Sequence, residues 1–116
     1  MKLVIINYGS GNLHSVHKAF EAVNNNLENP YEIIVTNTPS EILNADKLVL
    51  PGVGAFDPAM KNLMNSNLIT DLKNWIKSGK SFLGICLGLQ LLFESSDEGE
   101  VQGLGILKGK IQKIPH

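Results

Sequence analysis

The feature that most constrains the fold is a short turn around Cys86, the only cysteine in the chain. Residues 84–88 are Gly-Ile-Cys-Leu-Gly, which is the glycine–x–nucleophile–x–glycine spacing of a nucleophile elbow, with a thiol in place of the serine hydroxyl. An apolar run precedes this turn at 81–85, and a run with helical character follows it at 87–94. Free cysteines are often buried structural residues, but the flanking glycines favour a strand–turn–helix elbow with an exposed nucleophile.

Apolar runs alternate with segments of helical spacing along the chain. The first run, residues 2–7, is continuous, as expected for a strand that is buried on both faces. Alternating strands and helices indicate an α/β fold whose sheet is parallel or mostly parallel and flanked by helices. The predicted strands are 2–7, 31–35, 47–50, 81–85 and, as a strand or hairpin arm, 106–114. The predicted helices begin at 13, 39, 57 or 58, 67 (with Asn67 as its cap) and 87.

Three loops are expected to meet at one edge of this sheet, because parallel sheets carry their chemistry beyond the carboxyl ends of their strands. These loops are residues 8–12, residues 51–56 and the elbow at Cys86. The first loop is glycine-rich and follows a strand, as phosphate-binding loops do. It lacks both the complete Gly-x-Gly-x-x-Gly spacing and the lysine of a P-loop, so phosphate binding is the weaker hypothesis.

A cysteine that attacks an amide produces a tetrahedral oxyanion, which main-chain N–H groups must stabilise. By elbow geometry the N–H of Leu87, directly after the nucleophile, is one candidate donor. The second must come from another loop, and the glycine-rich segment Gly52-Val53-Gly54 can bring its backbone close to a substrate. An ordinary tight turn is the alternative interpretation of this segment.

Composition excludes several classes of function. The 116 residues are enough for one domain with a core, and ten basic against eleven acidic side chains give no electrostatic footprint for nucleic acid. A single cysteine excludes an internal disulfide, which fits a reducing compartment. The apolar run near the N-terminus is too short for a signal peptide or a membrane span. A cytoplasmic protein with no cofactor and no metal ion is expected.

A cysteine nucleophile normally needs a histidine base, which a third group orients. The three histidines are His14 and His17, within the first predicted helix, and His116, the last residue. No His-x-Glu or His-x-Asp pair occurs in the sequence. The residues therefore predict a nucleophile and an oxyanion loop without a convincing base.

Three segments, in order, resemble one known family. Residues 84–94, GICLGLQLLFE, resemble the nucleophile segment of class I glutamine amidotransferases. Residues 7–16, NYGSGNLHSV, and 51–56, PGVGAF, are similar to the glutaminase subunits of imidazole glycerol phosphate synthases. The resemblance extends from Met1 to His116, and it implies the α/β fold of class I glutamine amidotransferases.

The resemblance implies an activity and a partner. Such a subunit hydrolyses glutamine to glutamate and ammonia, and a (β/α)8-barrel synthase (cyclase) subunit uses the ammonia to make imidazole glycerol phosphate in histidine biosynthesis. The two subunits form a heterodimer. The resemblance implies that Cys86 is the nucleophile and carries the thioester, and that Gln90 contacts glutamine. It implies that the main chain at Gly52, Val53, Gly54 and Leu87 binds the substrate and the oxyanion. It also implies that Tyr8, Gly9 and Asn12 belong to an edge that faces the synthase.

The family's catalytic histidine and glutamate belong to a later His-x-Glu motif, which residues 1–116 do not contain. We therefore expect residues 1–116 to be the N-terminal portion of a single amidotransferase domain, inactive by itself. Two alternatives stay open. One is a non-catalytic fragment that keeps a partner-docking face. The other is a different cysteine hydrolase or a redox-responsive thiol on the same elbow, although no resolving cysteine supports the redox version.

Overall fold

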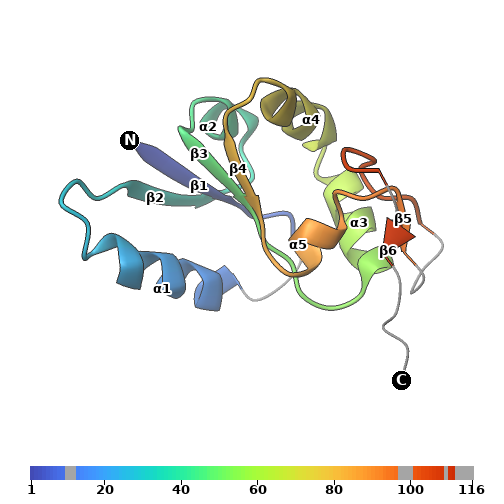
Figure 1. Ribbon diagram of the computed structural model, residues 1–116, viewed down its shortest axis with the longest axis horizontal. Coiled ribbons are helices and arrows are strands. Elements are labelled where there is room, and N and C mark those ends of the chain that lie inside the picture. Colours follow the sequence, from blue (N-terminus) through green and yellow to red (C-terminus); the bar gives the residue numbers. More distant parts are fainter. Residues whose placement is uncertain (10–12, 97–100, 109, 112–116) are drawn as a thin grey trace.

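A parallel sheet of four strands forms the centre of the fold, in the order β2 (Glu32–Thr36), β1 (Lys2–Ile6), β3 (Lys47–Leu50) and β4 (Ser81–Gly84) (Figure 1). The computed structural model describes residues 1–9, 13–96, 101–108 and 110–111. Every neighbouring pair in this sheet is parallel. The predicted α/β fold with a parallel sheet is therefore confirmed, and its four main strands lie within one residue of the predicted bounds.

Helices cover both faces of the sheet (Figure 1). The first helix packs on one face, and the next three contribute to the core on the opposite face. In the described part of the chain no helix is long and apolar enough to cross a membrane. The helices are α1 (Leu13–Asn24), α2 (Pro39–Leu43), α3 (Phe56–Asn65), α4 (Ile69–Lys77) and the short α5 (Leu87–Gln90).

Side chains of β1 alternate between the two faces, as the pleat of a strand requires. Val4 and Ile6 belong to the larger core beneath α2, α3 and α4. Leu3 and Ile5 pack instead with α1 residues such as Phe20. Because β1 lies inside the sheet, both sets of side chains are buried, which explains its continuous apolar sequence.

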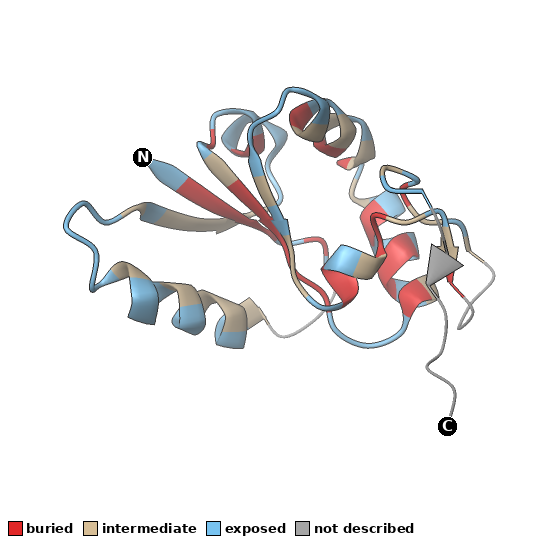
Figure 2. Ribbon diagram, viewed as in Figure 1, coloured by how far each residue is buried: buried red, intermediate tan, exposed pale blue. Residues whose placement is uncertain are grey.

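The two faces are covered to different extents (Figure 2). The core beneath α2, α3 and α4 contains most of the fully buried side chains, whereas α1 contributes none. The edge strand β4 is half-buried or exposed along its length, and Leu83 is 50% exposed. The elbow that follows β4 therefore lies at an exposed edge of the sheet.

The helix after Cys86 is shorter than predicted, ending at Gln90 rather than continuing to Glu94. The reason is that a later segment supplies hydrogen-bond donors to this stretch. The N–H of Leu104 donates to the carbonyl of Leu91 at 2.8 Å, and the N–H of Leu107 donates to that of Leu92 at 2.9 Å. These tertiary bonds take the place of helical ones, so the chain turns after one helical turn.

Two other predictions need correction. Asn67 does not cap α4, because the residue at the cap is Leu68. Asn67 instead has a φ of 62° in the turn between α3 and α4, a left-handed conformation that asparagine tolerates better than most residues. Of the strand or hairpin arm predicted at 106–114, residues 106–108 are not in a strand, and the described strand is β6 (Lys110–Ile111), which pairs in parallel with β5 (Ser95–Ser96) in a separate two-stranded sheet. Residues 109 and 112–114 lie outside the described residues.

Adjacent residues of α3 provide a test of this core. Leu63 is fully buried, whereas Met64 is 44% exposed. We expect Leu63→Ala to lower the free energy of unfolding by about 2–5 kcal/mol, because it leaves a cavity, and Met64→Ala to change it by about 0.5 kcal/mol or less. Urea denaturation of both variants measures the difference. Equal losses in the two variants would contradict this packing.

Candidate active site

Cys86 lies at the turn between β4 and α5, and its side chain is exposed. Its backbone has φ 53° and ψ −121°, a positive φ that residues other than glycine seldom adopt. Hydrogen bonds hold the residues on both sides: the N–H of Ile85 donates to the carbonyl of Leu50 at 3.0 Å, and that of Leu89 donates to the carbonyl of Cys86 at 3.0 Å. A strained residue persists only when its surroundings fix it in this way, and such residues cluster at functional sites.

The two glycines of the motif are needed for the close packing of the elbow. A Cβ built on Gly88 would lie 2.0 Å from the carbonyl oxygen of Leu50, and one on Gly84 would lie 2.9 Å from the Cα of Leu89. Real Cβ atoms do not approach backbone atoms so closely. The absence of a side chain at both glycines therefore lets the neighbouring backbone pass, and the elbow packs directly on the end of β3.

The loop after β3 reaches the elbow, as predicted. The N–H of Leu87 donates a hydrogen bond of 3.2 Å to the carbonyl of Gly52. The two segments expected to bind the oxyanion are thus adjacent. In this conformation, however, the loop directs the Gly52 carbonyl toward the elbow, and the Leu87 N–H is already bonded to that carbonyl. Val53 is 50% exposed, and Gly54 has a φ of 92° that suits glycine.

The loop after β1 joins the same region through a contact that sequence reasoning missed. The Tyr8 hydroxyl donates to the carbonyl of Pro51 at 2.5 Å. Tyr8 begins the loop that is predicted to face a partner, and its side chain is buried at 5% exposure, with the ring packed in the core beside this loop. Gly9 is exposed, whereas Asn12 lies outside the described residues. Only the position of the Tyr8 ring, at the end of β1, could have indicated this contact in advance.

Gln90, the expected contact for glutamine, lies one helical turn after Cys86 and is half-buried. The backbone N–H of Gln90 donates to the carbonyl of Cys86 at 3.4 Å. This spacing puts both side chains on one short helix next to the 51–54 loop. The structure therefore brings Cys86, Leu87, Gln90 and the Gly52 loop to the same edge of the sheet.

The histidines that the structure describes are both on α1. His14 is exposed, and Nε2 of His17 lies 2.8 Å from a carboxylate oxygen of Glu21. Within the described residues, no hydrogen bond joins either of them to Cys86, and no cluster of three or more His, Cys, Asp or Glu side chains could hold a metal ion. His116 lies outside those residues. Within the described residues, the candidate site therefore comprises the Cys86 thiol, the side chain of Gln90 and the backbone groups of Leu87 and the 51–54 loop.

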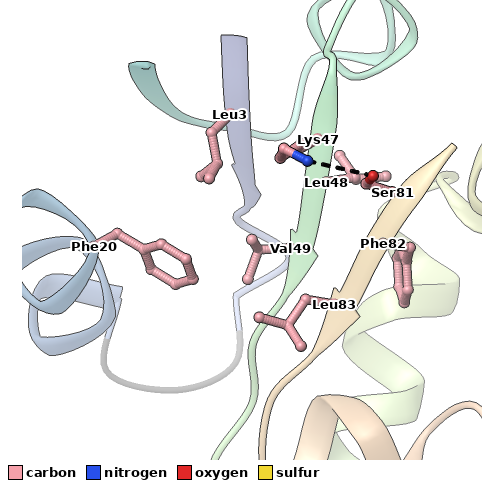
Figure 3. Close-up of a pocket in the computed structure, with 8 residues that line it drawn as sticks. All are labelled: Leu3, Phe20, Lys47, Leu48, Val49, Ser81, Phe82 and Leu83. Atoms are coloured by element: carbon pink, nitrogen blue, oxygen red, sulfur yellow. Dashed lines mark hydrogen bonds between the residues drawn. The ribbon is translucent and has the colours of Figure 1, made fainter. Parts of the chain in front are cut away.

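The cavity in Figure 3 is separate from this edge. It has a volume of about 160 Å³ and is mainly apolar, with Phe20 of α1 facing Val49 and Leu83 of the sheet (Figure 3). Lys47 and Ser81 mark its far end, where the Lys47 amine donates to the Ser81 hydroxyl at 3.4 Å. These two residues begin β3 and β4, whereas the elbow follows the carboxyl end of β4.

Comparison with known proteins agrees with this geometry. The profile of the CobB/CobQ-like glutamine amidotransferase domain matches residues 6–113, which include the elbow and both neighbouring loops. The chain belongs to the glutamine amidotransferases. The family resemblance inferred from residues 84–94 is thereby confirmed.

Several curated proteins are similar to this amidotransferase chain. A protein from Prochlorococcus marinus (strain MIT 9312), named imidazole glycerol phosphate synthase subunit HisH, is 65% identical over 115 residues, which are 99% of this chain and 53% of that protein. A protein of the same name from Aquifex aeolicus (strain VF5) is 54% identical over 123 aligned residues, covering 100% of this chain and 57% of that protein. The chain spans about half the length of the curated relatives it matches.

Proposed function

We propose that this chain carries the nucleophile of a glutaminase, which hydrolyses glutamine to glutamate and ammonia for imidazole glycerol phosphate synthesis in histidine biosynthesis. The observation that carries the proposal is the conformation of Cys86, an exposed thiol with positive φ on an elbow beside the Gly52 loop. Family membership and the names of the relatives support the same reaction.

In the proposed reaction the Cys86 thiolate attacks the side-chain carboxamide carbon of glutamine. The tetrahedral intermediate collapses when its nitrogen takes up a proton, so that the C–N bond breaks and ammonia leaves. The product is a glutamyl thioester on Cys86. Water then attacks this thioester, releasing glutamate and returning the thiol. In this proposal the side chain of Gln90, one turn along α5, contacts the bound glutamine.

The oxyanion of that intermediate needs hydrogen-bond donors beside the elbow. At this place the Gly52 carbonyl, an acceptor, now receives a bond from the Leu87 N–H. Rotation of the peptide between Gly52 and Val53 would turn this carbonyl away and point the Val53 N–H toward the elbow. It would also release the Leu87 N–H. We propose that ligand or partner binding favours this second orientation, which glycine makes accessible at low cost.

The ammonia acceptor in this proposal is a synthase subunit with a (β/α)8-barrel fold, bound as a heterodimer in the cytoplasm. The exposed backbone at Gly9, next to the site edge, is where we place part of the contact. Residues 1–116 form the N-terminal portion of the amidotransferase domain in this proposal. This assignment is supported by the coverage of the relatives, since the chain aligns with 53% of one and 57% of the other.

The 116-residue chain assayed alone is expected to show no sustained glutamine hydrolysis. The described histidines both lie on α1 and do not bond to Cys86, so neither of them is positioned to protonate the leaving nitrogen. Release of glutamate and ammonia by the purified chain measures this, with Cys86→Ser as the control. Sustained turnover that disappears in the control would mean that His14, His17 or His116 serves as the base.

A further inference from the structure

Tyr8 makes a buried hydrogen bond directly ahead of the peptide that the proposed mechanism rotates. Its hydroxyl donates to the carbonyl of Pro51 at 2.5 Å, across 43 residues of sequence. The hydroxyl also fills the space above the next residue, since a Cβ on Gly52 would lie 2.6 Å from the Tyr8 oxygen. The Pro51–Gly52 peptide is therefore held both by a hydrogen bond and by contact with the phenol.

Three successive carbonyls at the end of β3 have different partners. That of Leu50 accepts from Ile85, that of Pro51 accepts from Tyr8, and that of Gly52 accepts from Leu87. Rotating the peptide after Gly52 breaks the third bond only. The first two bonds stay intact, so they define where the rotating segment begins.

The position of Tyr8 is itself fixed by bonds at the following residue. The N–H of Gly9 donates to Oδ1 of Asn7 at 3.2 Å, and the Asn62 side chain of α3 donates to the carbonyl of Gly9 at 3.3 Å. Gly9 has a φ of 86°, a left-handed conformation that suits glycine. The backbone that follows Tyr8 is thus held by Asn7 after β1 and by Asn62 of α3.

We propose that Tyr8 is a positioning residue for glutamine hydrolysis, which holds the Pro51 carbonyl so that reorientation is confined to the single peptide after Gly52. This inference rests on the proposed glutaminase function. Without the Tyr8 hydroxyl, the Pro51–Gly52 peptide can move together with the Gly52–Val53 peptide. The oxyanion donor is then misplaced in many of the conformations that the loop visits, which lowers the rate of the chemical step without weakening the binding of glutamine.

The test is Tyr8→Phe in the full-length amidotransferase domain bound to its synthase partner, with Tyr31→Phe as the control. Tyr31 directly precedes β2, at the opposite end of the sheet from the elbow. For Tyr8→Phe we expect kcat with glutamine to fall about tenfold, less than the roughly 10²–10³ that loss of a whole oxyanion donor costs. The KM for glutamine and synthesis from added ammonia should stay within about twofold of wild type, and Tyr31→Phe should match wild type throughout. Unchanged kcat in Tyr8→Phe, or a rise in KM that accounts for the loss, overturns the inference.

A second pair of variants covers the case in which Tyr8→Phe does not fold. Asn62 is exposed, so Asn62→Ala removes the support at Gly9 with little effect on the core. We expect Asn62→Ala to lower kcat about threefold at unchanged KM, and Asn65→Ala, an exposed neighbour on the same helix, to leave kcat unchanged. Equal kcat values for this pair overturn the inference. If instead wild-type complex makes no product from glutamine, it is the proposed function that fails.

Discussion

In a complex of the full-length amidotransferase domain with its synthase partner, Cys86→Ala is expected to abolish glutamine-dependent synthesis, while synthesis from added ammonia continues at the wild-type rate. Alanine removes the only group on the elbow that can form a thioester, so a loss of about 10⁴–10⁶ in kcat is expected, as for other nucleophiles. The ammonia reaction should be preserved because, in the proposed function, the synthase partner performs it. Product formation from each nitrogen source, measured side by side, separates the two activities.

The matched control for this experiment is Leu89→Ala, on the same helix. Leu89 is 47% exposed, and we expect its replacement to leave both activities near wild type. The decisive comparison is between the two nitrogen sources in Cys86→Ala. If both activities disappear together in that variant, Cys86 is structural and the nucleophile assignment fails.

The second large effect is expected at the loop after β3. Gly52→Val should lower kcat for glutamine by about 10²–10³, equivalent to roughly 2.7–4 kcal/mol, which is the cost of losing one oxyanion donor. A side chain at this position collides with the Tyr8 hydroxyl and comes within 2.9 Å of the Gly88 nitrogen, so it displaces the loop from the elbow. Steady-state kinetics of the complex with glutamine measure the change.

Gly54 offers a comparison within the same loop. A Cβ there meets nothing within 4 Å, but its φ of 92° is unfavourable for other residues. Gly54→Ala should therefore reduce kcat less than Gly52→Val, with backbone strain of roughly 1 kcal/mol as its cause. Wild-type turnover by Gly52→Val would remove this loop from the mechanism.

The sheet and the elbow could be predicted because their signals are local. The continuous apolar run of β1 requires burial on both faces. The apolar strand that ends just before Cys86, together with Gly88 just after it, requires a tight turn at the cysteine. Adjacent parallel strands place their carboxyl ends together, so the meeting of the Gly52 loop and the elbow also followed from the sequence.

The remaining features depend on contacts between distant segments. The early end of α5 results from N–H groups of residues 104–107, and no pattern within 87–94 reveals them. The orientation of the Gly52 carbonyl toward Leu87 is one of two that a glycine peptide can adopt at similar cost. The bond between Tyr8 and Pro51 joins two loops whose separate sequences indicate turns only.

The most direct test of the central claim is to trap the acyl intermediate on Cys86. The complex is mixed with glutamine, quenched in acid within the time of a turnover and digested, and the peptide that contains Cys86 is examined by mass spectrometry. We expect a glutamyl adduct on this cysteine that forms with glutamine, does not form with added ammonia, and is released by treatment that cleaves thioesters. No adduct should form in Cys86→Ala. Glutamine turnover at the normal rate without an adduct on Cys86, or with an adduct on another residue, would contradict it.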